Sequence, residues 1–354
     1  MPRSFTSLAE IYAAPFDTVI DVRSPAEFAE DHVPGAISLP VLSNDERARV
    51  GTIYTQEAPF KARKIGAALV ARNAAAHIEG PLAGHDGAWK PLVYCWRGGQ
   101  RSGSFASILS QIGWRAETVE GGYRSYRRLV VAAMHDDPLP HRLVLLDGNT
   151  GTAKTELLGL LAARGVQVVD LEGLAAHRGS VFGAVARPQP AQKAFESGLA
   201  RAFAGLDPAR PVLVEAESSK IGNLLIPPSV WAAMTCAPRL RVSAPLDARA
   251  RYLARAYADM VADPAALRDV LALLIPFHGR DQVAAWQGMA ETGQFVALAG
   301  ELMARHYDAR YAKSRDARAG ATVTEVAVGD LTAPDLERAA DRLAEALHDM
   351  AAFA

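Results

Sequence analysis

Cys95 lies in the segment YCWRGGQRS, between an apolar run and a pair of glycines, with two arginines close behind it. A thiolate is a far better nucleophile than a thiol, and backbone N–H groups and arginines lower the pKa of a nearby thiol. Gly98 and Gly99 allow the chain to curl with its N–H groups pointing inward, and a helix beginning near Ser102 would add its N-terminal dipole. We predict an anion-binding loop in which Cys95, Arg97 and Arg101 are catalytic and the cradle comprises Trp96, Gly98, Gly99, Gln100 and Ser102.

The alternative interpretation of this segment is a buried cysteine at the end of a strand, followed by a turn with solvated arginines. A lone cysteine would favour that alternative. Here the glycine pair, the two arginines and the strand-to-helix context agree, so the sequence favours a functional loop. Arg101 lies six positions after Cys95, where its guanidinium could close the loop and hold an anion with two hydrogen bonds.

A second glycine-rich turn lies in the segment LVLLDGNTGTAKTELL, between an expected strand and an expected helix. This is the context of a P-loop, in which backbone N–H groups and a lysine cradle phosphates. Ala153 stands where the usual pattern has glycine, but alanine is compatible with helical angles, so we expect the loop to form. The alternative is an ordinary strand–helix turn. The predicted phosphate-binding residues are Gly148, Asn149, Thr150, Gly151, Thr152, Ala153, Lys154 and Thr155.

The segment PVLVEAES resembles the strand that carries an acidic residue beside a P-loop. Glu215 and Glu217 would lie on one side of an extended strand, because side chains repeat every two residues. They are candidates to organise Mg²⁺ or a water molecule, or to act as a base. Thr155 would supply the hydroxyl that commonly meets Mg²⁺. A pair of exposed carboxylates at a strand end is an equally good interpretation.

Strands that alternate with helices must position these loops. This alternation predicts an α/β fold with mainly parallel sheets and helices on their faces. From about residue 246 the chain is almost wholly helical in pattern, and residues 73–89 are expected to form a surface excursion. The expected strands are 16–22, 36–40, 90–96, 115–122 (a strand and turn), 141–148, 166–173 and 210–218.

The segment HDDPLPHR contains two prolines and two acids without apolar periodicity, which is typical of a domain boundary. We therefore predict a first domain at residues 1–135, a linker at 136–141 and a second domain at 142–354 with a helical C-terminal part.

The composition is that of a globular protein, with 50% hydrophobic and 22% charged residues. The formal net charge of −1 gives no global attraction to nucleic acid, so any such contact must use a local patch. Two cysteines cannot form a disulfide framework, and none of the Cys/His sets has zinc-ligand spacing. The N-terminus does not resemble a signal peptide, and no apolar run approaches the ~18 residues of a membrane span. We expect a cytoplasmic protein with no membrane partner.

The segment DVRSPAEFAEDHVPGAISLP, residues 21–40, is very similar to the N-terminal signature of rhodanese-like domains. In that family a loop cysteine at the end of a strand carries sulfur as a persulfide. The spacing from Cys95 to Arg101 is one residue longer than sulfur-carrying rhodaneses usually have, and resembles relatives that cradle a tetrahedral anion. One more residue widens the ring of N–H groups, which suits an anion of phosphate size.

The whole chain resembles the family of bacterial tRNA 2-selenouridine synthases. The resemblance runs from DVRSPAEF through PVLSNDERARVGTIY, YCWRGGQRSGSFASILSQIGW and EGGYRSYRR to LDGNTGTAKTELL, DLEGLAAHRGSVFG, QPAQKAFES and VEAESSKIGN, and it ends near ARHYDARY. It implies a rhodanese-like parallel-sheet domain followed by a P-loop α/β domain with helical C-terminal part. It also implies geranylation of wobble 2-thiouridine in certain tRNAs by geranyl diphosphate, followed by replacement of the geranylated sulfur with selenium from selenophosphate.

This resemblance implies roles for further residues and partners. Geranyl diphosphate and selenophosphate would be co-substrates without a tightly bound cofactor, and a selenophosphate supplier is a candidate partner. Cys95 would engage selenium, as a selenosulfide or by positioning an anion, while Arg97 and Arg101 neutralise its charge. The loop LEGLAAHRGSVFG would lie at the P-loop, which makes its members candidates for a supporting shell or base: His177, Arg178 and Ser180.

A tRNA anticodon region would bind through local clusters of arginine and aromatic residues, because this composition binds single-stranded loops by charge and stacking. Six arginines and two glutamates lie between residues 97 and 128, and RLRVSAPLDARARYLARAY is a second basic run. A solvated helix face is the alternative for any one of them. The candidates are Arg124, Arg127, Arg128, Arg249 and Arg251.

Two other functions compete with this interpretation. One is a rhodanese-type sulfurtransferase coupled to an ATP- or GTP-hydrolysing P-loop domain that acts on a small thiolated substrate. The other is a binding module whose two loops only sense anions. The retention of Cys95, Arg101, Lys154 and Thr155 together argues against the binding module.

Overall fold

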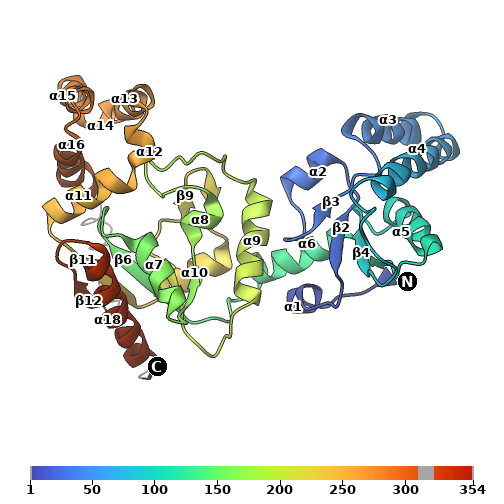
Figure 1. Cartoon of the computed structure of the whole chain (residues 1–354), viewed down its shortest axis with the longest axis horizontal. Coiled ribbons are helices and arrows are strands. Elements are labelled where there is room, and N and C mark those ends of the chain that lie inside the picture. Colours follow the sequence, from blue (N-terminus) through green and yellow to red (C-terminus); the bar gives the residue numbers. More distant parts are fainter. Residues whose placement is uncertain (1, 310–322, 353–354) are drawn as a thin grey trace. The chain divides into compact units, whose positions relative to one another are not determined.

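The computed structural model describes residues 2–309 and 323–352, and the chain divides into two compact units (Figure 1). The first unit comprises Met1–Asp137 and Pro190–Gly205, and the second comprises Pro138–Gln189 and Leu206–Ala354. Each unit contains a five-stranded parallel sheet. The expected α/β class is therefore confirmed.

The sheet of the first unit has the order β1-β5-β4-β2-β3, and all neighbouring strands are parallel. Helix α5 (Gln100–Ile112) packs against β4 and β5, and it ends at Gly113, whose φ of 111° suits only glycine comfortably. The expected strands near 16–22, 36–40 and 90–96 are present. The five strands are β1 (Pro2–Arg3), β2 (Thr18–Asp21), β3 (Ile37–Ser38), β4 (Pro91–Tyr94) and β5 (Glu117–Val119).

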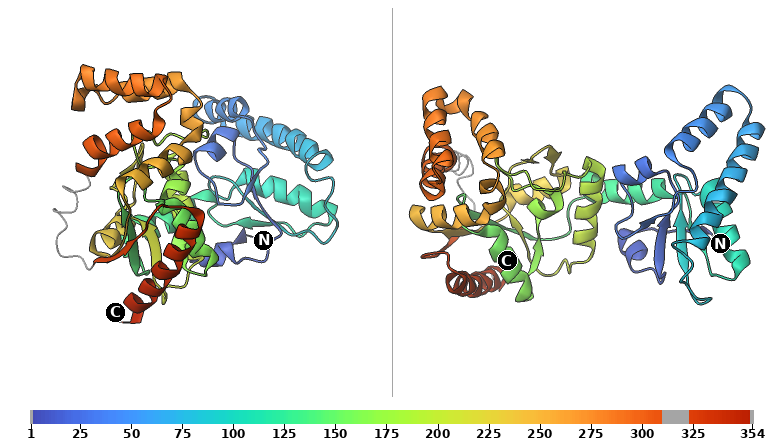
Figure 2. Two further views of the ribbon diagram at one scale, coloured as in Figure 1. Left: turned by 60° about the vertical axis from the view of Figure 1, so that its left-hand side comes forward. Right: turned by 45° about the horizontal axis from the view of Figure 1, so that its top comes forward.

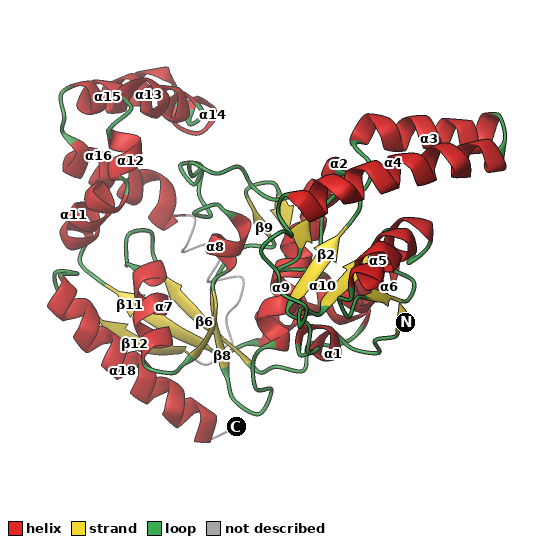
Figure 3. Cartoon of the chain, turned by 45° about the vertical axis from the view of Figure 1, so that its right-hand side comes forward, coloured by secondary structure: helices red, strands yellow, loops and turns green. Residues whose placement is uncertain are grey.

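A long helical hairpin interrupts this unit between β3 and β4. It consists of α3 (Asn44–Gln56) and α4 (Pro59–Glu79), which Figure 3 shows side by side, extending away from their sheet. The expected surface excursion at residues 73–89 is wrong for its first part, because α4 continues through residue 79. Ala74 is fully buried, and the Asn73 side chain donates a hydrogen bond to the carbonyl oxygen of Val41 over 2.9 Å. These contacts hold the last turns of the helix on the sheet unit.

Helix α9 (Gln192–Ala204) belongs to the first unit although its sequence lies inside the second predicted domain. It packs against α1 (Leu8–Tyr12) and α6 (Tyr123–Val131). Buried Asp31 accepts hydrogen bonds from Tyr123 over 2.6 Å and from Ser197 of α9 over 3.0 Å. Tertiary contacts of this kind, rather than any sequence boundary, assign α9 to the first unit.

The sheet of the second unit has the order β12-β11-β6-β8-β7, again with parallel neighbours. Helices α7 (Lys154–Ala163) and α18 (Ala333–Ala352) pack together on it and share an apolar core (Figure 1). The run RLRVS, noted in the sequence only for its charge, forms β11. The strands are β6 (Leu143–Gly148), β7 (Gln167–Val169), β8 (Val212–Glu215), β11 (Arg239–Ser243) and β12 (Val323–Ala327).

Four smaller elements accompany this sheet. Helix α8 (Leu171–Ala175) contacts β8, and α10 (Pro228–Cys236) contacts β6. Strands β9 (Lys220–Ile221) and β10 (Leu224–Leu225) form a separate antiparallel pair. The expected strand 166–173 is shorter than predicted, because α8 begins directly after β7 at the N-cap Asp170.

The helical part that follows β11 confirms the expectation for the chain beyond residue 246. Its helices appear in orange in Figure 2 and enclose a core around Trp286 and Leu298. None of the helices in the described part of the chain is long and apolar enough to cross a membrane. The helices are α11 (Leu246–Ala256), α12 (Ala258–Val261), α13 (Pro264–Ala272), α14 (Ile275–His278), α15 (Arg280–Glu291) and α16 (Phe295–Leu302), followed by a π-helix at Met303–Tyr307.

Candidate functional site

The loop between β6 and α7 closes on itself in the manner expected of a phosphate cradle. Lys154 is the first residue of α7, and its Nζ donates a hydrogen bond to the carbonyl oxygen of Gly148 over 2.9 Å. Thr152 Oγ1 donates to the carbonyl oxygen of Asn149 over 2.8 Å. Gly151 has a φ of 84°, and a Cβ there would lie 2.9 Å from the carbonyl oxygen of Arg249. The lysine therefore lies over a tight backbone ring at a helix N-terminus, which is a ready site for phosphate.

Ala153 adopts the left-handed conformation, with φ 60° and ψ 30°, immediately before α7. Our expectation that it takes ordinary helical angles is therefore wrong. The loop needs a left-handed residue at this point, which for a residue other than glycine costs roughly 1–2 kcal/mol. The methyl group is 4% exposed and packs in the core with Leu157 and Leu158, which offsets part of that cost.

Arg249 lies under the phosphate-binding loop rather than on the surface. It is 6% exposed, and its guanidinium pairs with the carboxylate of Asp308 through bonds of 3.0 and 2.8 Å. It also donates a hydrogen bond to the carbonyl oxygen of Thr150 over 3.2 Å. This buried ion pair fixes the loop from below, so Arg249 is a positioning residue for the loop and is not available to tRNA phosphates.

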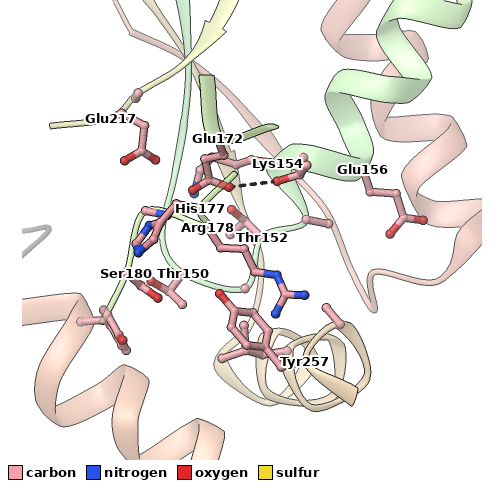
Figure 4. Close-up of a pocket in the computed structure, with 18 of the residues that line it drawn as sticks. Thr150, Thr152, Lys154, Glu156, Glu172, His177, Arg178, Ser180, Glu217 and Tyr257 are labelled. Atoms are coloured by element: carbon pink, nitrogen blue, oxygen red, sulfur yellow. Dashed lines mark hydrogen bonds between the residues drawn. The ribbon is translucent and has the colours of Figure 1, made fainter. Parts of the chain in front are cut away.

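Two carboxyl groups face the lysine across the cavity. Glu172 lies on α8 and Glu217 follows β8, and Figure 4 shows both side chains near Lys154. Burial and, after it, the charge of Glu217 raise the pKa of Glu172 to about 8; burial also raises the pKa of Glu217. Glu172 therefore holds a proton at neutral pH, which reduces the negative charge that a bound phosphate would meet.

Glu172 also faces the helix end that carries Thr155. Thr155 Oγ1 donates a hydrogen bond to Glu172 Oε2 over 3.4 Å, drawn as a dashed line in Figure 4. A hydroxyl and a carboxylate beside a phosphate cradle are ligands that suit Mg²⁺, which usually keeps several waters and substrate phosphates. Among the described residues, no group of three or more His, Cys, Asp or Glu could hold a metal ion by itself.

Glu215 and Glu217 do not act on one side of a strand, contrary to the expectation from the sequence. Strand β8 ends at Glu215, and the chain turns there, since the Glu217 N–H donates to the carbonyl oxygen of Glu215 over 2.9 Å. Glu217 lines the cavity, whereas Glu215 is fully buried and accepts a hydrogen bond from the Leu171 N–H over 2.8 Å. Burial raises the pKa of Glu215 well above its ordinary value, which suits a structural residue that ties α8 to β8.

The loop after α8 reaches the cavity, as its likeness to the synthase family implied. His177 Nδ1 accepts a hydrogen bond from the Gly179 N–H over 3.1 Å, and burial lowers the pKa of His177, which favours a neutral ring. Arg178 pairs with Asp259 at 2.9 Å, and its guanidinium lies 4.6 Å from the ring centre of Tyr257. Ser180 Oγ accepts a hydrogen bond from the Phe182 N–H over 3.2 Å. All three candidates line the cavity beside the loop (Figure 4).

The cavity itself has a volume of about 830 Å³ and lies wholly within the second unit. The phosphate-binding loop, α8 and its following loop, and α11 contribute its walls. Sequence reasoning missed Glu172 and Tyr257 among the lining residues. A signal for Glu172 was available, because LEG forms the carboxyl end of the expected strand 166–173, and ligand sites of parallel sheets lie at and beyond the carboxyl ends of their strands.

The predicted anion loop of the first unit begins where β4 ends. Cys95 is buried, and Ser102 Oγ of α5 donates a hydrogen bond to its Sγ over 3.2 Å. Gly98 has a φ of 65°, and a Cβ on it would lie 2.6 Å from the carbonyl oxygen of Val119. The carbonyl oxygen of Cys95 accepts from the Tyr123 N–H over 2.8 Å. The loop is thus built from close backbone contacts, with the thiol at the N-terminal end of α5.

The two arginines of this loop have different environments. Arg97 is exposed, whereas Arg101 pairs with Glu27 at 2.9 Å. Burial alone would raise the pKa of Glu27, but the hydrogen bonds and charge of Arg101, with smaller help from Arg47, lower it to about 2. Arg101 therefore does not close the loop over Cys95 in this conformation, contrary to expectation. Gln100 and Ser102 begin α5, and the Trp96 ring stacks on Tyr123 with centroids 5.3 Å apart.

The remaining tRNA candidates also differ in environment. Arg124 and Arg128 are exposed on α6, and Arg251 is exposed on α11 with ion pairs to Asp247 and Asp330. Arg127 is different, because its side chain is 16% exposed and pairs with Glu196 of α9. Three of the five candidates are therefore accessible to a polyanion, and Arg127 and Arg249 serve the fold.

The described geometry defines a class of protein in which a rhodanese-like domain with a cysteine loop is joined to a P-loop α/β domain. The Rhodanese-like domain family matches residues 4–129, and the tRNA 2-selenouridine synthase AAA domain family matches residues 141–269. The tRNA 2-selenouridine synthase of Cupriavidus pinatubonensis is 31% identical over 342 residues, covering 86% of this chain and 90% of that protein. The chain belongs to the family of tRNA 2-selenouridine synthases.

Two further relatives with the same name are more similar over shorter stretches. That of Bdellovibrio bacteriovorus is 36% identical over 65% of this chain, and that of Hahella chejuensis is 38% identical over 68% of it. These alignments span 62% and 63% of the relatives' own lengths, which is less than two thirds. A crystal structure of an N-terminal domain from Clostridium difficile 630 is 32% identical over 37% of this chain, with a TM-score of 0.31.

Proposed function

We propose that this protein is a tRNA-modifying transferase that converts wobble 2-thiouridine to 2-selenouridine in two steps. The observation that carries the proposal is the closed phosphate-binding loop, with Lys154 folded over it, in a cavity of about 830 Å³. Relatives named tRNA 2-selenouridine synthases support the substrate and product, and the rhodanese-like unit supports a chalcogen donor.

In the first step the P-loop holds the diphosphate of geranyl diphosphate. The thiouridine sulfur attacks carbon 1 of the geranyl chain; a carbon–sulfur bond forms, the carbon–oxygen bond breaks, and pyrophosphate leaves with the electron pair. Lys154 and the loop N–H groups stabilise the charge that grows on the leaving group, which lowers the barrier. In the site without Mg²⁺, protonated Glu172 suits this role because it adds no negative charge beside the diphosphate.

Mg²⁺ would join this step through Thr155 and Glu172. Thr155 lies in the first turn of α7 and Glu172 lies on α8, and Thr155 Oγ1 is 3.4 Å from Glu172 Oε2. When bound, the ion would neutralise diphosphate charge and would take the place of the Glu172 proton, so Glu172 is a neutral acid in the site without Mg²⁺ and would be a carboxylate ligand in the site with it.

In the second step selenium enters at the Cys95 loop. Selenophosphate is a tetrahedral anion, and exposed Arg97 and the N-terminal N–H groups of α5 can neutralise it. Selenium attacks carbon 2 of the base, a carbon–selenium bond forms, and the geranyl thiolate leaves with its electron pair. Water then cleaves the phosphorus–selenium bond and releases phosphate. A selenosulfide on Cys95 would need an oxidant, so we assign the soft Cys95 sulfur to contacting and orienting selenium.

Mass spectrometry of nucleosides tests this function on thiolated tRNA. The protein is incubated with geranyl diphosphate and selenophosphate, each added singly and together. We expect geranyl-thiouridine with geranyl diphosphate alone, and selenouridine with both. Unchanged thiouridine in every reaction would refute the proposal, and hydrolysis of ATP or GTP by the same sample would favour the rival sulfurtransferase.

A further inference from the structure

A second, smaller cavity of about 70 Å³ lies in the helical part of the second unit. It is lined by side chains of α11, α12, α13 and α16, and by Phe182 from the loop after α8. The residues that line only this cavity are all apolar, among them Phe182, Ala254, Met260, Leu267, Phe295 and Leu298.

This apolar cavity adjoins the phosphate site. The two cavities share Thr150 of the phosphate-binding loop and Ser180, Leu253, Tyr257 and Tyr307. Figure 4 shows Thr150, Ser180 and Tyr257 together on one side of the phosphate site. The polar groups of the smaller cavity therefore lie at the junction, and beyond them the surface is hydrocarbon.

We propose that the smaller cavity binds the hydrocarbon chain of a prenyl diphosphate whose diphosphate lies on the P-loop. This inference rests on the proposed function and identifies where the tail of its first substrate binds. A site with a phosphate cradle at one end and an apolar wall at the other matches an amphiphilic diphosphate, because each part of the ligand meets its own chemistry. A nucleoside base would need polar partners, and those that line the cavity lie only at the junction.

The buried leucines in its wall limit what the cavity can hold. Leu267, Leu298 and Leu302 line it and are themselves 4–6% exposed members of the surrounding core. A close-packed core resists expansion, since each added methylene must displace packed side chains. The cavity of about 70 Å³ therefore takes only the last few carbons of a chain, and the rest of the chain lies in the larger cavity toward the phosphate site.

Binding measured by calorimetry on the full chain tests the inference. The probes are inorganic pyrophosphate and the isopentenyl, geranyl and farnesyl diphosphates. We expect geranyl diphosphate to bind about 10-fold or more tightly than pyrophosphate and more tightly than isopentenyl diphosphate, and we expect the longer farnesyl chain to add no further affinity because the cavity is small. Ala254→Leu fills the small cavity from α11 without touching the phosphate site, because Ala254 lines only the smaller cavity.

The Ala254→Leu variant should lose most of the preference for geranyl diphosphate and keep the affinity for pyrophosphate, which also shows that the variant folds. Ala297→Leu is the matched control, because Ala297 is exposed on α16 and should change neither affinity. Equal affinities of wild type for pyrophosphate and geranyl diphosphate would overturn the tail site and leave the phosphate site intact. Absence of pyrophosphate binding to wild type would overturn the phosphate site and, with it, the inference.

Discussion

Thr155 Oγ1 donates a hydrogen bond to Glu172 Oε2 over 3.4 Å, across the entrance to the phosphate-binding loop. The contact joins the first turn of α7 to α8, and thus the carboxyl ends of β6 and β7. Because Glu172 holds a proton at neutral pH, this side of the site changes charge when the pH is raised. The phosphate site therefore has a built-in pH dependence.

Pyrophosphate affinity measured without Mg²⁺ should fall as the pH rises through about 8, the pKa of Glu172. Above that pH the ionised Glu172 carboxylate repels pyrophosphate. Because the group is partly exposed, we expect the affinity to fall by about 3- to 10-fold. The free energy of unfolding should change with pH in the same direction. Because the pKa of Glu172 is raised in the folded state, its contribution to stability is fully present below the pKa of the unfolded state and is lost as the pH rises through about 8. Calorimetry on wild type and Glu172→Gln separates this effect from the titration of pyrophosphate itself. Equal pH profiles for the two proteins would contradict the assignment.

Arg249→Ala should destabilise the protein by about 3 kcal/mol, because it leaves Asp308 without its buried partner. It should also weaken pyrophosphate binding, since Arg249 supports the carbonyl oxygen of Thr150. Arg251→Ala, two positions along α11, removes only exposed ion pairs and should change stability by less than about 0.5 kcal/mol. Denaturant unfolding and calorimetry measure both quantities. Equal effects of the two variants would show that Arg249 does not position the loop.

Substitutions of Ala153 test the left-handed residue in the loop. Ala153→Gly relieves conformational strain of roughly 1–2 kcal/mol but removes a buried methyl group, so the free energy of unfolding should change by less than about 1 kcal/mol. Ala153→Val places a β-branched side chain at φ 60° and should lower the free energy of unfolding by about 2 kcal/mol or more. The same variant should also lose pyrophosphate binding. Thermal unfolding compares the two variants. A fully active Ala153→Val protein would mean that the loop adopts another conformation when it binds phosphate.

Cys95→Ser should leave geranylation intact and stop selenium entry, because oxygen does not replace the soft sulfur that contacts selenium. The hydrogen bond from Ser102 Oγ to the residue at position 95 can persist, so the loop should keep its shape. Cys236→Ser, at the exposed second cysteine, is the control and should behave as wild type. Nucleoside mass spectrometry measures the selenouridine that each variant forms. Normal selenouridine formation by Cys95→Ser would show that Cys95 has no role in the second step.

Much of the fold could be predicted from the sequence, because the strands that carry the loops are short apolar runs with clear turn signals. β6, α7, β4 and α5 lie where the patterns predict them. The loop residues follow from these elements, since Cys95 comes directly after buried β4 and Lys154 begins the helix that follows buried β6.

Other features depend on tertiary contacts that local patterns do not encode. The pairing of Arg101 with Glu27 joins residues 74 positions apart, and Asp31 holds Ser197 across 166 positions. Glu215 was assigned to the cavity on a period of two, which fails because the chain turns directly after β8. The hairpin of α3 and α4 was missed, because few of its residues are buried and they form no clear apolar stripe: Ile53, Ala62, Leu69, Val70 and Ala74.

The separation of the two steps between the two loops is tested most directly with Lys154→Ala. Its nucleoside products are measured on two substrates in the presence of selenophosphate: thiolated tRNA with geranyl diphosphate, and tRNA that already carries geranyl-thiouridine. Lys64→Ala, an exposed lysine of α4, is the control and should convert both. We predict that Lys154→Ala leaves the thiolated tRNA unchanged and converts the geranylated tRNA to selenouridine. Geranylation by Lys154→Ala at the wild-type rate would contradict a role of the P-loop in the first step. Failure of Lys154→Ala to convert the geranylated tRNA would show that the P-loop also serves the second step, which contradicts the separation of the two steps.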